Sequence, residues 1–149
     1  MRNSNSALFL CVTALCFQTT ILGQTWVKQT SPTANNLNAV HFLDSNNGWI
    51  VGDGVKYKTT DGGVNWSTVI GNSLNINDVV LLNNDITFLA TETGTYRNAG
   101  INSWFFDGSG HWNSADFIGS DIGYVVGTEG KMLKYYNGAT EFNFLTSGT

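Results

Sequence analysis

The carboxylates are the side chains of this sequence that could do chemistry. The chain contains 11 Asp and Glu residues against 7 Lys and Arg, a formal net charge of −4. Two carboxylates facing each other across a sugar could hydrolyse a glycosidic bond, one as acid and the other as base or nucleophile. Asp44 and Asp121 stand in the turn sequences D-S-N-N-G and S-D-I-G, whereas Asp78 and Asp116 lie on strand-like segments that could line a channel. We interpret these four as turn or channel-lining residues and predict that the chain is not an enzyme.

The strongest motif surrounds another carboxylate, Asp61. Residues Thr59–Trp66 read T-T-D-G-G-V-N-W and match the Asp-box pattern Ser/Thr-x-Asp-x-Gly-x-x-Trp/Phe at Thr59, Asp61, Gly63 and Trp66. The Asp61 carboxylate is placed to accept N–H groups of its own turn, and Gly63 permits the positive φ that such turns need. Trp66 is expected to open the following strand and to wedge its indole between neighbouring sheets. We therefore predict that the four motif residues are structural.

The elements that must position these residues form a repeat. Three copies begin at Leu37, Leu74 and Ser114, and each is predicted to contain four short strands of alternating apolar and polar residues, in the first copy 38–43, 48–53, 55–60 and 66–70. A four-stranded unit of about 40 residues is a β-propeller blade. The sequence predicts an all-β partial propeller with blades at 37–73, 74–111 and 112–149. Equivalent positions are Val40, Val79 and Ala115; Phe42, Leu81 and Phe117; Trp49, Phe88 and Tyr124; Val51, Ala90 and Val126; and Trp66, Trp104 and Phe142.

Two segments precede the repeat. Arg2 and the apolar stretch 7–22 are typical of a signal peptide with cleavage near Gly23, so 1–23 is predicted to be removed and the protein to be secreted or periplasmic, without a membrane span. Residues 24–36 are predicted to hold an outer strand, T-W-V-K-Q (Thr25–Gln29), and a linker. Three blades are fewer than the four to eight that typically close a propeller. We therefore expect further blades in a longer chain, or closure by association.

Metal and cofactor sites are not predicted. His41 and His111 lie far apart in the repeat and have no second ligand at a useful spacing. The glycines lie between strands without a following helix, so no phosphate loop is predicted, and the absence of a basic stripe argues against nucleic acid. Trp112 breaks the repeat pattern in the loop after D-G-S-G, and we predict it as the one aromatic residue that contacts a ligand, with carbohydrate as a candidate.

The string G-W-I-V-G-D-G-V-K-Y-K-T-T-D-G-G-V-N-W (Gly48–Trp66) resembles the repeat of the photosystem II assembly/stability factor family, within the BNR/Asp-box (sialidase-like) superfamily. The second copy departs from it at N-A-G-I-N-S-W and the third at Y-N-G-A-T-E-F. The resemblance implies a β-propeller in a secreted bacterial protein, here partial. Sialidases of that superfamily hold the substrate carboxylate with three arginines, whereas Arg97 is the only arginine after the signal peptide, so sialidase activity is not expected.

These features favour a secreted or periplasmic, non-enzymatic propeller segment that acts as a protein-binding or assembly scaffold. Its partner is expected to be another protein or further blades of its own chain. Two alternatives remain open. The chain could be a truncated part of an Asp-box glycoside hydrolase, or a photosystem II assembly factor if its source is photosynthetic.

Overall fold

The computed structural model describes residues 27–71, 73–99, 104–137 and 139–145. The chain divides into two units, Met1–Thr30 and Ser31–Thr149. Within the first unit, residues 27–30 form neither helix nor strand and have no ladder partner among the described residues. The outer strand predicted at Thr25–Gln29 belongs to a blade whose inner strands come from elsewhere, so it stays a prediction. The predicted signal peptide and Trp26 lie outside the described residues. In the described part of the chain, no helix is long and apolar enough to cross a membrane.

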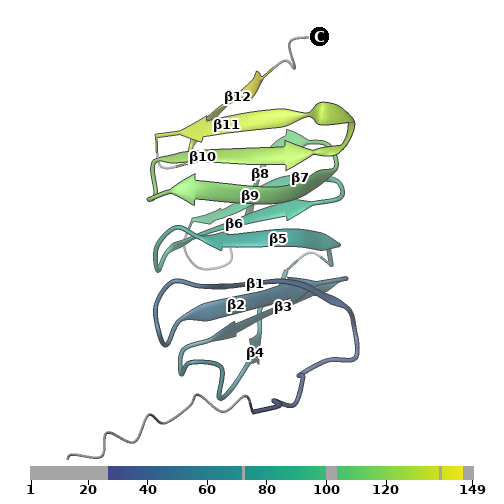
Figure 1. The fold of residues 1–149 in the computed structure, drawn as a ribbon, viewed down its shortest axis with the longest axis vertical. Helices are drawn as coiled ribbons and strands as arrows, with labels where there is room; N and C mark the ends of the chain where they lie inside the picture. The colour runs from purple at the N-terminus through teal and green to yellow at the C-terminus, as the bar shows by residue number, and fades with distance from the viewer. Residues whose placement is uncertain (1–26, 72, 100–103, 138, 146–149) are drawn as a thin grey trace, which may run out of the picture. The chain divides into compact units, whose positions relative to one another are not determined.

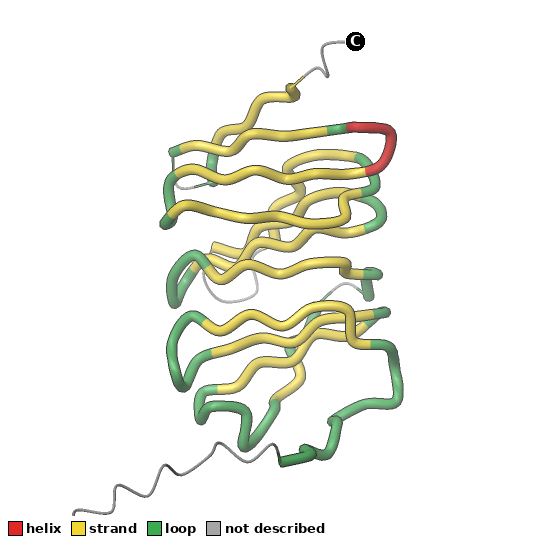
Figure 2. Tube along the Cα trace, viewed as in Figure 1, coloured by secondary structure: helices red, strands yellow, loops and turns green. Residues whose placement is uncertain are grey.

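The second unit consists of three four-stranded antiparallel sheets, each made of strands consecutive in sequence (Figure 1). Each sheet is a blade, so the predicted all-β partial propeller is confirmed. One turn of 3₁₀ helix, η1 (Thr128–Gly130), joins the second and third strands of the last blade (Figure 2). Blade 1 comprises β1 (Leu37–Phe42), β2 (Gly48–Gly52), β3 (Val55–Thr59) and β4 (Ser67–Thr68); blade 2 comprises β5 (Ile76–Leu81), β6 (Ile86–Thr91), β7 (Gly94–Ala99) and β8 (Trp104–Ser109); blade 3 comprises β9 (Trp112–Ile118), β10 (Ile122–Gly127), β11 (Met132–Tyr136) and β12 (Glu141–Leu145).

The first three strands of blade 1 lie within one residue of their predicted bounds. The fourth is much shorter than predicted: β4 covers Ser67–Thr68 and begins after Trp66. Its pairing with β3 ends there because only Tyr57 and Lys58 have partners on β4. The twelve strands found among the described residues lie inside the predicted blade boundaries.

The blades stack through their faces, with β1 beside β5 and β5 beside β9 (Figure 1). Side chains alternate between the two faces of a strand, so each blade has one face toward the blade that follows it in sequence and one toward the blade that precedes it. We call these the forward face and the backward face. The forward faces carry Trp49 and Val51 in blade 1, Phe88 and Ala90 in blade 2, and Tyr124 and Val126 in blade 3. The backward faces carry Val40 and Ile50, Val79 and Leu89, and Ala115 and Val125, in the same order.

Two apolar cores lie between the blades. Between blades 1 and 2, Val51 packs with Ile76, Val79, Leu81 and Leu89. The core between blades 2 and 3 joins Val80, Phe88, Ala90, Trp112, Ala115, Val125, Leu133, Tyr135 and Ala139. Burying a large apolar side chain contributes roughly 1.5–3 kcal/mol. Blade 2 therefore supplies apolar residues to both cores, which explains why β6 reads I-T-F-L-A-T without polar alternation.

Candidate interaction surface

The turn between β3 and β4 is held by Thr59 and Asp61. The Thr59 hydroxyl donates to Asp61 Oδ1 (2.8 Å) and accepts the N–H of Gly63 (2.9 Å). Asp61 Oδ1 also accepts the Asn65 N–H (2.9 Å), and Oδ2 accepts Asn65 Nδ2 (2.8 Å). Gly63 has a φ of 87°, which a side chain would strain. The hydrogen bonds from Asn65, followed by that from Thr59, hold the pKa of Asp61 below its ordinary value. All of these contacts lie within the turn itself.

Asp61→Ala is expected to lower the melting temperature by about 4–8 °C, because the turn loses its acceptor for three donors. The lowered pKa adds a pH dependence: the ionised carboxylate stabilises the fold at neutral pH, and this contribution is lost as the pH falls through the lowered pKa. Thermal unfolding followed by circular dichroism at neutral and acidic pH measures both effects. Asn84→Ala, in an exposed turn of blade 2, is the control. An unchanged melting temperature for Asp61→Ala would contradict the structural role of the turn.

Trp66 does not occupy the place predicted for it. Its half-buried indole meets Phe42 of its own blade edge to face, at 6.1 Å between ring centroids. The predicted wedge is made by its repeat equivalent, Trp104, which meets Trp49 of the preceding blade at 6.2 Å. Lys56 Nζ lies 5.7 Å from the centroid of the same Trp104 ring. The difference arises because no described sheet covers the backward face of blade 1.

The prediction that Trp112 contacts a ligand is wrong. Trp112 is 0% exposed and belongs to the core between blades 2 and 3. It opens strand β9 at the position that Ile76, also 0% exposed, takes in β5. Its indole ring packs near Phe144, at 6.4 Å. Trp112 therefore follows the repeat rather than breaking it, and it is buried by residues of blades 2 and 3.

Two of the predicted turn and channel carboxylates, Asp44 and Asp116, accept N–H groups of residues close to them in sequence. Asp44 accepts the N–H groups of Asn46 (2.7 Å) and Asn47 (2.8 Å) in its own turn. Asp116 is exposed on β9, where Oδ1 accepts the N–H of Phe117 at 3.0 Å. Among the described residues, no group of three or more His, Cys, Asp or Glu side chains could hold a metal ion. These carboxylates thus serve the local backbone.

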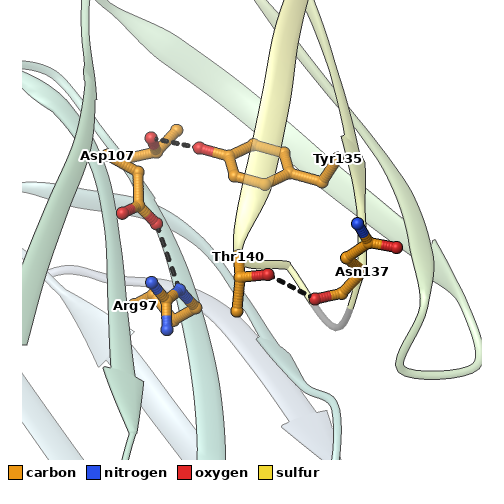
Figure 3. A network of polar contacts seen from close by, with 6 residues as sticks. Arg97, Asp107, Tyr135, Asn137 and Thr140 are labelled. Carbon is orange, nitrogen blue, oxygen red and sulfur yellow. Dashed lines mark hydrogen bonds and ion pairs between the residues drawn. The ribbon is translucent and has the colours of Figure 1, made fainter.

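Arg97 forms an ion pair with Asp107 of the same blade (Figure 3). Its Nε donates to Asp107 Oδ2 at 3.3 Å, and both side chains are largely buried, 13% and 12% exposed. Its guanidinium also lies 5.2 Å from the Phe105 ring centroid. Burial raises the pKa of Asp107 and outweighs the opposite effect of Arg97. The hydroxyl of Tyr135 is 2.7 Å from that of Thr95, and burial raises its pKa. The hydrogen bond between Thr95 and Tyr135 joins blade 2 to blade 3.

Polar side chains of the inner strands tie one blade to the next. Asn38 Nδ2 donates to the carbonyl of Ile76 (2.9 Å), and its repeat equivalent Asn77 donates to the carbonyl of Trp112 (2.8 Å). Each Asn stands at a register shift of its inner strand, where the ladder to the second strand is interrupted. A β-bulge of this kind leaves a residue outside the ladder and re-aims its side chain. We call this contact the asparagine clip.

Two further inner-strand side chains bridge blades. His41 Nδ1 accepts the N–H of Leu81 in the next blade at 3.1 Å, which places the ring proton on Nε2. Asp78 Oδ2 accepts the N–H of Ala115 (2.9 Å) and the hydroxyl of Ser114 (2.8 Å). Asp78, predicted to line a channel, therefore bonds to the following blade.

Asn77→Ala is expected to lower the free energy of unfolding by about 1–2 kcal/mol. The variant removes the clip between blades 2 and 3 and leaves the Trp112 carbonyl without its donor. Chemical denaturation measures the loss. Asn143→Ala, on the exposed outer strand β12, is the matched control and is expected to change stability by about 0.5 kcal/mol or less. Equal effects of the two substitutions would show that the clip contributes nothing.

The two terminal faces of the stack are apolar and exposed. On the forward face of blade 3, Tyr124 is 40% and Val126 42% exposed, whereas their equivalents Phe88 and Ala90 in blade 2 are both 0% exposed. The backward face of blade 1 is similar, with Val40 61% exposed against 2% for its equivalent in blade 2. A hollow of about 390 Å³ on that face is lined by Leu37, Asn38, Ala39, Val40 and Ile50. Contiguous exposed apolar surface of this kind marks an interaction site.

Stacked four-stranded blades with apolar terminal faces define a β-propeller segment, and comparison with solved structures agrees. No family model and no curated protein matches the sequence. The fold is similar to that of two solved structures of YCF48. The structure "YCF48 bound to D1 peptide" has a TM-score of 0.63 and 19% identity over 76% of this chain and 42% of that one. YCF48 from Cyanidioschyzon merolae gives 0.63 and 20% over 78% and 38%. The chain thus spans about two fifths of the length of these propellers, and the likeness shows a shared fold.

The asparagine clip was not predicted from the sequence, although a signal for it was present. Asn38, Asn77 and Asn113 are separated by the same intervals as Trp49, Phe88 and Tyr124. A polar residue that recurs at one position of an inner strand indicates a contact repeated between blades.

Proposed function

We propose that this chain is an exported, non-enzymatic β-propeller segment that acts as a protein-binding or assembly scaffold. The observation that carries the proposal is the exposure of two apolar blade faces whose repeat equivalents are buried between blades. Apolar faces of this kind mark sites at which another protein surface binds. The signal-peptide pattern of residues 1–23 supports export.

The fold comparison adds support of a second kind. One of the similar propellers is described as bound to the D1 peptide, so a protein of this fold takes a peptide partner. Because fold alone does not imply function, the argument for this chain rests on its own exposed faces. Arg97 is held in an ion pair with Asp107, which is consistent with a structural rather than a substrate-binding role.

Two measurements on the purified chain test the proposal. We expect no release of reducing sugar from a panel of β-glucans, and binding of peptides selected from a displayed library. At a chain concentration low enough for single chains, peptide affinity is expected to fall about tenfold or more in Val126→Asp, because a charge then replaces an apolar contact. Asn84→Asp adds the same charge in an exposed turn of blade 2 and serves as the control.

Sugar release that tracks with the folded protein would overturn the non-enzymatic proposal and favour the glycoside hydrolase alternative. Selected peptides that bind Val126→Asp and the unaltered chain equally would overturn the assignment of the forward face of blade 3 as the binding surface.

A further inference from the structure

The forward face of blade 3 and the backward face of blade 1 are the two halves of a blade–blade interface. Between blades 2 and 3, Phe88 and Ala90 of one forward face pack with Ala115 and Val125 of the next backward face. The same pairing of positions, with other residues, recurs between blades 1 and 2. The exposed forward face carries Tyr124 and Val126 at the positions of Phe88 and Ala90. The exposed backward face of blade 1 carries the complementary positions.

We propose that the forward face of blade 3 packs on the backward face of blade 1 in a second copy of this chain, and that two copies close head to tail into a six-bladed ring. The inference rests on the proposed scaffold function, since it names the partner of the same two faces. Six blades lie within the range of about four to eight in which propellers close. Head-to-tail contacts generate closed rings when their rotation closes, and a twofold ring satisfies both open faces at once.

The asparagine clip continues across this contact. Asn113 is the third member of the Asn38 and Asn77 series, and it stands at the same kind of register shift, between Trp112 and Ser114 on β9. It is exposed, and its amide makes no hydrogen bond to any described residue. In the series, each Asn donates to the residue that precedes the next Asn. The acceptor for Asn113 is then the carbonyl of Leu37 in the second copy.

The series is anchored by a second set of equivalent bonds. The residue after each second strand donates its N–H to the carbonyl two positions before the clip asparagine: Asp53 to Asn36, Glu92 to Asn75 and Thr128 to His111. These three bonds show that Leu37, Ile76 and Trp112 occupy the same place in their blades. The Leu37 carbonyl therefore has the same place in its blade as the carbonyls of Ile76 and Trp112, which accept hydrogen bonds from the side-chain amides of Asn38 and Asn77.

Asp116 supplies a second polar contact in the same register. It stands at the position of His41, whose Nδ1 accepts the N–H of Leu81 from the next blade. Asp116 uses Oδ1 for the N–H of Phe117, which leaves Oδ2 for a donor across the contact. The equivalent of Leu81 in the second copy is Phe42. In the proposed contact, Asp116 Oδ2 is thus the acceptor for the N–H of Phe42 in the second copy.

The sequence of β10 fits a strand that is covered on both sides. It reads I-G-Y-V-V-G, and its backward-facing Val125 is 0% exposed while Tyr124 and Val126 are open. Strands with one solvated face alternate apolar with polar residues, whereas strands buried on both faces do not. Strand β6 of the middle blade has the same apolar character and is covered on both faces.

The first test is the mass of the full chain in solution by light scattering. We expect twice the mass of one chain, reduced to one chain in Val126→Asp with an unchanged circular dichroism spectrum, because Val126 is already 42% exposed in the single chain. Asn84→Asp is expected to keep the doubled mass. A monomeric unaltered chain would overturn this proposal, and peptide binding by that monomer would leave the scaffold function standing. A ladder of larger masses would overturn the closed ring.

The second test reads the register of the contact. In a background with Cys11→Ser and Cys16→Ser, one preparation carries Asn113→Cys and the other Leu37→Cys. Mixed and oxidised, they are expected to form a disulfide-linked pair in high yield, since the clip brings these positions together. Asn113→Cys mixed with Ser67→Cys, on the exposed outer strand β4 of blade 1, is expected to give background yield. Equal yields in the two mixtures would overturn the head-to-tail register.

Discussion

Phe88→Ala is expected to lower the free energy of unfolding by about 3–5 kcal/mol. Phe88 is 0% exposed and lies between two blades, where its ring meets Phe117 at 5.1 Å and Tyr135 at 5.0 Å. Truncation removes the buried ring and leaves a cavity that two rigid sheets cannot close. Aromatic pairs add about 0.5–1.5 kcal/mol beyond the burial of area. Chemical denaturation measures the loss.

Tyr124→Ala is the matched control for Phe88→Ala, because the two residues occupy the same position of successive blades. Tyr124 is 40% exposed and its ring lies 5.8 Å from Lys134 Nζ. At a chain concentration low enough for single chains, we expect a loss of about 1 kcal/mol or less. A loss as large as that for Phe88→Ala would show that the forward face of blade 3 is covered within the single chain.

Asp107→Ala is expected to lower the free energy of unfolding by about 2–3 kcal/mol. Asp107 stands at a register shift of β8, which turns its carboxylate toward Arg97 on β7. The variant leaves a guanidinium that is 13% exposed without its counter-charge. We place the loss below the 3–5 kcal/mol typical of fully buried pairs, because both side chains keep some contact with water.

The double variant Arg97→Met with Asp107→Leu distinguishes the ion pair from simple packing. Replacing both charges by apolar groups of similar size is often neutral or stabilising, so we expect the double variant to lie within about 1 kcal/mol of the unaltered protein. Losses that simply add in the two single variants and the double variant would contradict coupling between Arg97 and Asp107.

The pH dependence of Asp107 has the opposite sign to that of Asp61. Because burial raises the pKa of Asp107, protonation favours the folded chain. Its contribution to stability is present at acid pH and is lost as the pH rises through the raised pKa. The lowered pKa of Asp61 gives a contribution that is lost as the pH falls. Asp107→Asn is therefore expected to remove the loss of unfolding free energy that accompanies a rise in pH through the raised pKa of Asp107. The loss that accompanies a fall in pH through the lowered pKa of Asp61 is expected to remain.

Much of the fold could be predicted because its signals are local. Alternation of apolar and polar residues located β1, β2 and β3 within one residue, and the recurrence of Trp49, Phe88 and Tyr124 separated the blades. Strand β4 was predicted too long, because its end depends on where β3 ceases to pair with it, and that pairing is not encoded in the segment 66–70 alone.

The candidate site could be predicted only in part. Trp112 looked like an exception in the sequence because a glycine-rich turn precedes it, yet it is 0% exposed in the core between blades 2 and 3. The roles of Asp78 and His41 depend on partners in a neighbouring blade, some 37 to 40 residues away in the chain. No local pattern reports such partners.

By itself, the sequence determined the number of described blades, the bounds of three of the four strands of blade 1 and the absence of a sialidase arginine set. These properties follow from side-chain type and spacing within a few residues. Only the tertiary structure decided which equivalent residues are buried and which are open. Phe88 and Tyr124 have similar side chains at the same repeat position, but one is covered by the next blade and the other is not. Burial depends on what lies against a face, and that is a property of the stacked blades.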